Sequence, residues 1–512
     1  MTRSLYARLM QRYQSERFNA SRRDMLKLTL AGAAGMLLSG PAFARAVRGS
    51  AGKRVVVLGA GFSGLACAHE LIAAGYDVTV IEARSRIGGR VLSFNAANAN
   101  EYIPGRNIEG GAELIGSNHP TWVAYAKQFG LDFLDVTEDE SLTSPVVLGG
   151  QVLSDDDNAA LYKELDLAYP LMNKDAAEVD EDTPWTHPKA KEWDARTLQQ
   201  WIDTLEVGEL GKKGIALQLM ADNGVECASQ SYLGNLAMVK GGGLEKFWTD
   251  SEVYRCKQGN DALAHKLAGA IGKDRITLEL PASKVEIKGD RVVVTCRDGR
   301  EIECDELVCT VPPTVWSRIQ WRPALPGALS PQMGLNVKYL AHVKERFWLK
   351  HKQGPDALSD GLINMTWDGA DNQGEKKEEG PACLVGFSGA ASCKRALDMD
   401  KPARDEAYAA EYEKMYAGFK EAFVETRFMD WPNDPWLKAG YSFPAPGQVT
   451  AMGPTLREGL GRIHFAGEHT CYKFVGYMEG ALNSGASVAK RMAMRDGVIK
   501  APAPAAPAPA KS

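Results

Sequence analysis

A glycine-rich stretch near the start of the chain has the residue types and spacing of a phosphate-binding turn. It reads Gly59-Ala60-Gly61-Phe62-Ser63-Gly64, a G-x-G-x-x-G pattern. Gly59 suits a tight turn, Gly61 lets a pyrophosphate approach the backbone, and Gly64 allows a helix to pack closely on a strand. The pattern predicts that the protein binds a dinucleotide.

The flanking segments supply the elements that must position this turn. Residues 55–58 form an apolar run typical of a buried parallel strand, and residues 65–72 have a helical pattern. A second strand over residues 77–81 ends on Glu82. The helix N-terminus would face the phosphates, and Glu82 would accept hydrogen bonds from ribose hydroxyls. The alternative is a purely structural glycine loop, and the ordered series of elements argues against it.

A second glycine turn follows directly, at Gly88 and Gly89. Arg90, the next residue, can neutralise a diphosphate that the helix dipole offsets only in part. Proteins that bind NAD and proteins that bind FAD both contain the strand, glycine turn and helix described above. The second glycine turn therefore decides between the two cofactors. With it, the chain resembles the flavin-containing amine oxidase family, which includes monoamine oxidases, polyamine oxidases and L-amino acid oxidases.

The resemblance extends over residues 53–492, and residues 461–470 and 476–485 look like the family's last strand and last helix. It implies that Glu468 binds the ribityl or pyrophosphate region of FAD, and that the backbone at Val285 meets the adenine. The full set of FAD-binding residues implied is Gly59, Gly61, Ser63, Gly64, Glu82, Ala83, Arg84, Gly89, Arg90, Ala112, Glu113, Val285, Trp436, Gly467, Glu468, Tyr477 and Met478.

The implied fold class is α/β (α+β), with a Rossmann-type FAD-binding lobe interleaved with a substrate-binding lobe of mixed sheet plus a helical insertion. We assign residues 52–118, 252–327 and 434–495 to the FAD-binding domain. Residues 119–251 and 328–433 form the substrate-binding domain, and residues 119–251 are its helical part.

Three residues are expected to carry the chemistry. Lys338 resembles the family lysine that holds a water against flavin nitrogen 5, where a buried cation would also stabilise nascent superoxide. Tyr441 and Tyr477 occupy the positions of two aromatic residues that flank the flavin and steer a neutral amine. Alternatively, Lys338 is a surface lysine and the tyrosines are ordinary core residues. Gly440 stands where monoamine oxidases carry the cysteine that bonds to flavin, which predicts non-covalent FAD.

The substrate subclass is less clear from the sequence. The Gly467-Glu468-His469-Thr470 stretch resembles bacterial secreted L-amino acid oxidases, which predicts oxidative deamination of an L-amino acid to a 2-oxo acid, ammonia and hydrogen peroxide. The alternative is a monoamine or polyamine oxidase that produces an aldehyde, because Leu114 replaces the arginine that clamps the substrate carboxylate in venom enzymes. Trp248, Gly476, Glu113 and the two tyrosines are the expected substrate-contacting residues, and Glu113 could instead bind a distal cationic group.

Two other functional classes fit the sequence less well. Gly61-Phe62-Ser63-Gly64 and Gly386-Phe387-Ser388-Gly389 faintly resemble a nucleophile elbow, but Leu65 and Ala390 replace the second glycine, so a serine hydrolase is rejected. A non-catalytic flavoprotein is disfavoured because Lys338 and the two tyrosines occur together.

The first 44 residues resemble a twin-arginine export signal. Arg22 and Arg23 precede a short apolar run, and Ala42-Phe43-Ala44 supplies a small-x-small cleavage pattern. The run is too short for a comfortable membrane span, so we expect a periplasmic or secreted protein without a membrane anchor. At the other end, residues 496–512 are expected to form a disordered Ala/Pro tail.

Composition argues against further classes of function and partner. The 512 residues carry a formal net charge of −5, which argues against nucleic acid as a partner. The nine cysteines contain no CxxC pair, so we expect buried thiols and no metal site. The expected partners are therefore a small amino acid or amine and oxygen. The oligomeric state stays open, a homodimer included.

Overall fold

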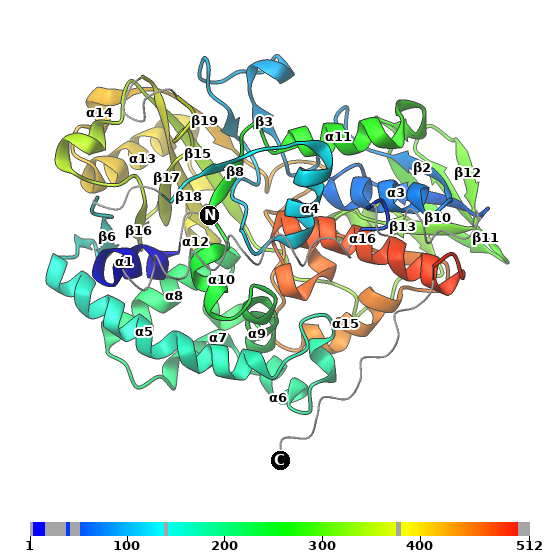
Figure 1. Cartoon of the computed structure of the whole chain (residues 1–512), viewed down its shortest axis with the longest axis horizontal. Coiled ribbons are helices and arrows are strands. Elements are labelled where there is room, and N and C mark those ends of the chain that lie inside the picture. The colour runs from blue at the N-terminus through cyan, green and yellow to red at the C-terminus, as the bar shows by residue number, and fades with distance from the viewer. Residues whose placement is uncertain (1–3, 16–36, 41–51, 138–141, 375–379, 500–512) are drawn as a thin grey trace.

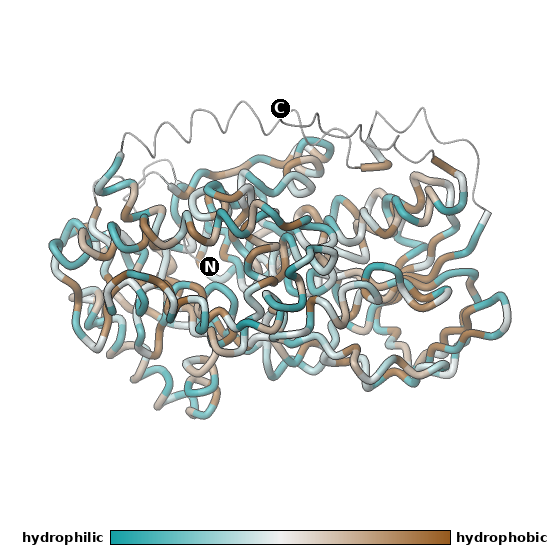
Figure 2. The backbone as a smooth tube through the Cα atoms, turned by 90° about the horizontal axis from the view of Figure 1, so that it is seen from below, coloured by the Kyte–Doolittle hydropathy of each residue, from teal (hydrophilic) through white to brown (hydrophobic). Residues whose placement is uncertain are grey.

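The computed structural model describes residues 4–15, 37–40, 52–137, 142–374 and 380–499. Two lobes lie at opposite ends of the long axis (Figures 1 and 2). The predicted mixed α/β architecture is confirmed. No helix among these residues is long and apolar enough to cross a bilayer.

The first lobe is built around a five-stranded sheet in which every neighbouring pair is parallel. Its strands, in spatial order, are β20 (Ile463–Phe465), β13 (Glu306–Cys309), β1 (Arg54–Leu58), β2 (Asp77–Ile81) and β9 (Ile276–Thr277). The chain passes from β1 to β2 on one side, and β13 lies on the other side of β1. This arrangement creates a switch point at the carboxyl ends of β1 and β13, where open parallel sheets bind ligands.

Helices pack on this sheet and bring distant segments together. They are α3 (Phe62–Ala73), α4 (Pro120–Phe129), α11 (Asp261–Ile271) and α16 (Met478–Arg495). Helix α16 lies directly against α3, and a Cβ at Gly485 would overlap the carbonyl oxygen of Ser63. Glycine at this position therefore sets the close approach of the two helices.

A smaller sheet and several short elements complete this lobe. The four-stranded sheet consists, in spatial order, of β12 (Glu301–Cys304), β11 (Arg291–Cys296), β10 (Ala282–Lys288) and β14 (Gln320–Arg322). The other short elements are β3 (Ser93–Phe94), β4 (Ile108–Glu109), β5 (Phe133–Asp135), β8 (Tyr254–Cys256) and α15 (Gln448–Glu458).

The short 3-10 helices of the described chain are η2 (Ala96–Asn98), η3 (Pro184–Thr186), η4 (Cys227–Ser229), η5 (Lys273–Arg275), η6 (Pro313–Arg318), η7 (Phe347–His351), η8 (Glu468–Thr470) and η9 (Tyr472–Phe474).

The second lobe contains a seven-stranded mixed sheet. Its strands, in spatial order, are β19 (Phe423–Met429), β15 (Asn336–Val343), β18 (Ala382–Gly389), β17 (Met365–Asp368), β16 (Ala357–Ser359), β6 (Val146–Leu148) and β7 (Gln151–Val152). Its neighbours pair antiparallel except for β16 with β6. Alternation along β15 gives the sheet two apolar faces: Tyr339 stacks on Tyr408 at 4.4 Å, whereas Leu340 packs in the core of the helical region.

Helices cover this sheet. The helices between β18 and β19 are α12 (Ala390–Leu397), α13 (Lys401–Met415) and α14 (Phe419–Ala422). The helical region consists of α5 (Asp155–Ala177), α6 (Ala190–Ala195), α7 (Leu198–Asp203), α8 (Glu209–Asn223), α9 (Tyr232–Gly241) and α10 (Glu245–Asp250). The segment 119–251, expected to be the helical part, also supplies β5, β6 and β7. Its α4 packs on the first lobe because Trp122 and Tyr125 are fully buried there.

The N-terminal helix α1 (Leu5–Tyr13) is folded into the second lobe, beside α5 in Figure 1. Leu5, Tyr6, Leu9 and Met10 are each at most 4% exposed. The Leu5 amide donates to Gln218 at 2.8 Å, and the Tyr6 hydroxyl donates to Asp166 at 2.6 Å. Part of the predicted export signal therefore belongs to the hydrophobic core of the second lobe, because its apolar side chains pack against that lobe.

The structure tests only part of the other predictions made for the two termini. Arg22, Arg23 and residues 42–44 lie outside the described residues. Residues 500–512 of the expected Ala/Pro tail also lie outside, but its first residues do not. Val498 and Ile499 are 5% and 4% exposed in the core of the first lobe, so the prediction of disorder from residue 496 is wrong for residues 496–499.

Candidate active site

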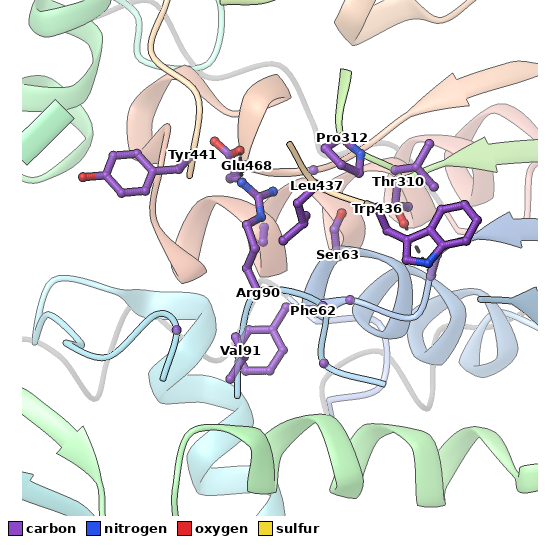
Figure 3. A pocket seen from close by; sticks show the side chains of 18 of the residues that line it. Phe62, Ser63, Arg90, Val91, Thr310, Pro312, Trp436, Leu437, Tyr441 and Glu468 are labelled. Carbon is purple, nitrogen blue, oxygen red and sulfur yellow. Dashed lines mark hydrogen bonds and ion pairs between the residues drawn. The ribbon is translucent and has the colours of Figure 1, made fainter. Parts of the chain in front are cut away.

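A cavity lies at the carboxyl ends of β1, β2, β13 and β20. The residues that follow these strands, Gly59, Glu82, Thr310 and Gly467, all line it. Figure 3 shows that Tyr441 and Trp436 lie on opposite sides of this cavity, with Arg90, Glu468 and Ser63 between them. We call these the Tyr441 end and the Trp436 end.

The first glycine turn delivers the N-terminus of α3 to the cavity. Gly59 has φ +105°, and a Cβ at Gly64 would overlap the Gly59 carbonyl oxygen. Gly61 caps α3, and a Cβ there would find its nearest neighbour at 3.8 Å, at the Gly89 backbone. Gly59, Gly61 and Ser63 line the cavity, whereas Gly64 is not among its lining residues. The free amides of the first helical turn can therefore bind an anionic group.

Glu82 lies at the end of β2 and also lines the cavity. It is 8% exposed and accepts hydrogen bonds from the amides of Ala60 at 2.7 Å and Arg84 at 2.9 Å. The carboxylate is thus held rigidly at the place where a ribose would lie beside the glycine turn. Arg84 in turn forms a two-point ion pair with Asp434, at 2.8 and 2.6 Å.

The second turn positions Arg90. Gly88 and Gly89 both have positive φ, +91° and +60°. Arg90 donates from Nη1 to Glu468 Oε1 at 2.8 Å and to the Gly440 carbonyl at 2.9 Å. It therefore links the glycine-rich segment to residues more than 300 positions later and presents a cation in the middle of the cavity.

Glu468 is buried at 3% exposure and accepts several hydrogen bonds. Its donors are Arg90, the Ser442 hydroxyl at 2.6 Å and the Gly476 amide at 2.9 Å. Burial raises the pKa of Glu468, but Arg90, the neighbouring His469 and the Ser442 hydroxyl outweigh it, so the net pKa is lowered. The ionised carboxylate thus fixes Arg90 and the backbone around Gly476.

Lys338 belongs to a buried chain of charges. It lies on the same face of β15 as Leu340, is 5% exposed, and its Nζ donates to Glu113 Oε2 at 2.7 Å. Glu113 Oε1 accepts from Arg255 Nε at 2.7 Å, and Arg255 also pairs with Asp371. Burial raises the pKa of Glu113, but Lys338 and Arg255 outweigh it and lower the pKa to about 2. Lys338 and Glu113 both line the cavity.

The two expected aromatic residues meet at one end of the cavity. Tyr441, Tyr477 and Gly476 all line it. Gly476 has φ +85°, and a Cβ there would lie 3.1 Å from Tyr441 Cδ2, so glycine leaves room for the ring. The Tyr441 hydroxyl donates to the Asp222 carbonyl at 2.7 Å, and the Tyr477 ring packs against His119 at 5.4 Å. Burial raises the pKa of both tyrosines, so both stay protonated.

Besides Gly64, two expected positions are not among the lining residues. Trp248 was expected in a wall of the substrate pocket, but it stacks on Tyr169 at 3.9 Å and donates to Asn173 at 2.8 Å. Val285 is fully buried in β10, and the nearby lining residues are Leu280, Pro281 and Ala282. The remaining residues expected to bind FAD or substrate do line the cavity: Ala83, Arg84, Gly89, Ala112, Trp436, Gly467 and Met478.

Sequence reasoning missed several polar residues of the wall, among them Arg297, Arg318, Glu252 and Asn336. Glu252 lies between α10 and β8, and no motif marks it. Asn336 precedes Lys338 by two residues on β15, so the alternation of the strand could have placed both on one face. Asn336 Nδ2 is buried and has no hydrogen-bond partner among the described residues.

The arrangement fits a flavin dinucleotide. A helix N-terminus and Arg90 can bind a diphosphate, and Glu82 can accept from a ribose. Asn336 Nδ2 remains as a donor without a partner. All nine cysteines are buried and free, and none is among the lining residues, so the described wall offers no thiol for a covalent link.

Comparisons with known proteins agree with this site. The family model for flavin-containing amine oxidoreductases matches residues 62–493. Flavin-containing amine oxidase A of Equus caballus is 27% identical over 458 residues, which cover 86% of this chain and 84% of that protein. Flavin-containing amine oxidase B of Sus scrofa is 27% identical over 461 residues, which cover 86% and 85%.

Solved structures share the fold. A triple mutant of putrescine oxidase matches with a TM-score of 0.78 at 23% identity, over 86% of this chain and 99% of that chain. Cyclohexylamine oxidase from Brevibacterium oxydans matches with a TM-score of 0.76 at 24% identity, over 87% and 99%. With the family match over most of its length, the chain belongs to the flavin-containing amine oxidoreductases and uses FAD as its cofactor.

Proposed function

We propose that the protein oxidises amines that lack an α-carboxylate. A primary amine, oxygen and water would yield an aldehyde, ammonia and hydrogen peroxide. FAD, when bound, accepts the hydride from the carbon that bears the nitrogen. Tyr441 and Tyr477 would orient the neutral amine, and Lys338 would hold a water at the reacting end of the cavity.

The charges at the Tyr441 end carry this proposal. The lining cations are Arg84, Arg90, Arg297, Arg318 and Lys338. Arg297 and Arg318 lie over the Trp436 ring, at 5.2 and 5.8 Å, so they belong to the opposite end. Lys338 is already paired with Glu113. A substrate carboxylate entering beside the tyrosines would therefore find no free lining cation among the described residues, and it would also meet Glu252.

This proposal departs from the L-amino acid substrate that the sequence led us to expect. Leu114, which replaces the arginine of venom enzymes, is 8% exposed and lines the cavity. The relatives and structures described above are named as oxidases of amines, putrescine and cyclohexylamine. Both observations support the amine branch.

Oxidation of L-amino acids remains a second candidate because of one observation. Asn336 Nδ2 is a buried donor without a partner among the described residues, and its residue lines the cavity. An amide donor can bind a carboxylate, although more weakly than a guanidinium can.

The decisive experiment measures hydrogen peroxide released by the FAD-loaded protein. Each L-amino acid is tested beside the amine formed by its decarboxylation. Turnover of the amines alone supports the proposal. Turnover of the amino acids alone overturns it and favours the second candidate, which Asn336→Leu would then test by raising KM for the acids.

We further propose that the protein leaves the cytoplasm by the twin-arginine route. The supporting features are Arg22-Arg23, the apolar run that follows, and the small residues at 42–44. Replacing both arginines by lysine should retain the protein in the cytoplasm, which cell fractionation and immunoblotting would measure. Unchanged export of this variant would contradict the proposal.

A further inference from the structure

Helix α1 packs where three helices of the second lobe meet. Ser4, the residue that caps its N-terminus, donates a hydrogen bond from its hydroxyl to the Trp248 carbonyl of α10. The Leu5 amide donates to the Gln218 side chain of α8 at 2.8 Å. The helix also lies along α5, as Figure 1 shows. Its first turn is therefore fixed to both α8 and α10.

Hydrogen bonds connect this first turn to a tyrosine of the cavity wall. Gln218, which is 1% exposed, accepts from Leu5 and donates through Nε2 to both carboxylate oxygens of Asp222, at 2.7 and 2.8 Å. The main-chain carbonyl of Asp222 accepts from the Tyr441 hydroxyl at 2.7 Å. Helix α10 ends two residues before Glu252, which also lines the cavity. The start of α1 is thus joined by short connections to the Tyr441 end.

The chain begins near this end of the cavity. Only three residues precede Ser4, and three residues span at most about 11 Å. Burial raises the pKa of Glu252, and the chain's N-terminal ammonium is the charge that opposes this rise. Burial also raises the pKa of Asp222, to about 7, against the Gln218 hydrogen bond and the same ammonium. Because water and salt confine such effects to short distances, the ammonium compensates carboxylates at the Tyr441 end.

A substrate amine would be attracted by the same carboxylates. In neutral solution an aliphatic amine arrives as an ammonium ion, because its pKa is like that of lysine, ~10.4. A cavity lined by a carboxylate attracts such an ion, and Glu252 lines this cavity together with Tyr441 and Tyr477. The ammonium of the chain itself therefore competes with the substrate for this end of the cavity.

Helix α1 also covers the surfaces that it contacts. Leu5 is fully buried, and Leu9 and Met10 are each 4% exposed. Without the helix, the surfaces of α5, α8 and α10 beneath it would face solvent. Gln218, which leads to Asp222, would be among the residues uncovered.

We propose that the segment through the end of α1 is an intramolecular inhibitor, which keeps the uncleaved protein weakly active until the segment is removed. The inference rests on the proposed amine oxidation and the proposed export. Cleavage at the predicted site, after Ala44, would detach the whole segment. Inhibition up to that point would limit the release of hydrogen peroxide inside the cell.

The test uses the FAD-loaded full chain with a recognition site for a specific protease inserted after Ala44. Peroxide release from amines is measured before cleavage, and again after cleavage and removal of the freed segment by gel filtration, confirmed by mass spectrometry. The kcat/KM should rise by at least about 10-fold. A synthetic peptide of residues 1–15 should restore inhibition by raising KM at constant kcat. The same peptide with an acetylated N-terminus, which lacks the charge, should inhibit less.

Leu5→Asp tests the same inference without cleavage. A carboxylate in the buried first turn should release α1, so that kcat/KM of the full chain rises as it does in the cleaved protein. Ser15→Asp is the matched control, because it adds the same charge at an exposed residue just beyond α1, and it should stay as inhibited as the wild type. Flavin absorbance and thermal unfolding show that each variant is folded.

Several outcomes would overturn the inference. One is an equal kcat/KM before and after removal of the segment. Another is a lower kcat/KM afterwards, which would make α1 a support for Tyr441. Both leave amine oxidation intact. Equal inhibition by the acetylated peptide would overturn the role of the ammonium.

Failure of the proposed function gives a different result. Turnover of L-amino acids alone would overturn amine oxidation, and the rates with those acids before and after cleavage would still test the inhibitor. An absence of turnover in both forms would overturn both proposals.

Discussion

Lys338 Nζ lies 2.7 Å from Glu113 Oε2, and the two residues, 225 positions apart, are both at most 5% exposed in the cavity wall. Arg255 binds the other oxygen of the same carboxylate. The pair therefore holds the lysine ammonium at a defined place, and Glu113 keeps a partner when Lys338 is replaced.

This geometry predicts a selective effect of Lys338→Met. Loss of a preorganised cation should slow the reaction with oxygen by about 10- to 1,000-fold. Turnover with an electron-accepting dye should fall much less, because a dye does not need a fixed cation. Oxygen uptake and dye reduction would be measured side by side. Lys344→Met, which replaces an exposed lysine just after β15, is the control. An unchanged oxygen rate in Lys338→Met would refute the role.

Glu468 is predicted to hold the flavin site together. Glu468→Ala should weaken FAD binding by about 10- to 100-fold, because it leaves Arg90 and the Gly476 amide without their acceptor. Glu468→Gln keeps acceptor capacity and should have the smaller effect. Flavin retained after gel filtration, read from absorbance, measures the change. Glu458→Gln, an exposed carboxylate on α15, should retain FAD fully. Full retention by Glu468→Ala would contradict the assignment.

FAD is predicted to be non-covalent. Gly440 has no side chain, a Cβ there would overlap the Asn336 amide, and no cysteine is among the lining residues of the described chain. Denaturation in acid or urea should therefore release all the flavin into the supernatant. A flavin fluorescence band that stays with the protein on a denaturing gel would overturn this prediction.

The raised pKa of Glu109 predicts that the free energy of unfolding depends on pH. Burial raises its pKa to about 8, and Asp261 and Glu113 add to this effect against the hydrogen bonds from Asn260 and Ser93. Because the folded-state pKa lies above the unfolded value of ~4.3, this contribution to stability is complete below that value. It is lost as pH rises through about 8.

Glu109→Gln removes this titration. The free energy of unfolding of the variant, relative to the wild type, should therefore rise between pH 5 and 8, by up to about 1 kcal/mol per pH unit. Urea unfolding at several pH values measures it. Glu303→Gln, an exposed carboxylate on β12, should show no such trend. A constant difference across this range would show that Glu109 is ionised throughout.

Helix α1 predicts a coupling between N-terminal processing and stability. Leu5 is fully buried, so Leu5→Ala in the full chain should lower the free energy of unfolding by about 2–4 kcal/mol. Leu167→Ala is the matched control, because that leucine on α5 is 65% exposed. If export removes residues 1–44, the processed protein lacks α1 and should melt at a lower temperature than the full chain. Equal stability of Leu5→Ala and wild-type full chains would contradict the packing of α1.

The sequence determined the features that depend on neighbouring residues. The run from β1 through the glycine turn and α3 to β2 and Glu82 spans about thirty residues. Its turn geometry, helix start and strand alternation are properties of the local backbone. The sequence alone therefore predicted the two glycine turns, the position of Arg90, the inward-facing side chain of Lys338 on β15 and the FAD-binding family.

Only the tertiary structure decided which charged side chains pair with one another. Lys338 and Arg255 meet Glu113 across separations of 225 and 142 residues. The same packing turned Trp248 onto Tyr169 and buried α1 of the predicted signal. The physical reason is that pairing and burial depend on the distances between segments remote in the chain, and no local pattern encodes those distances.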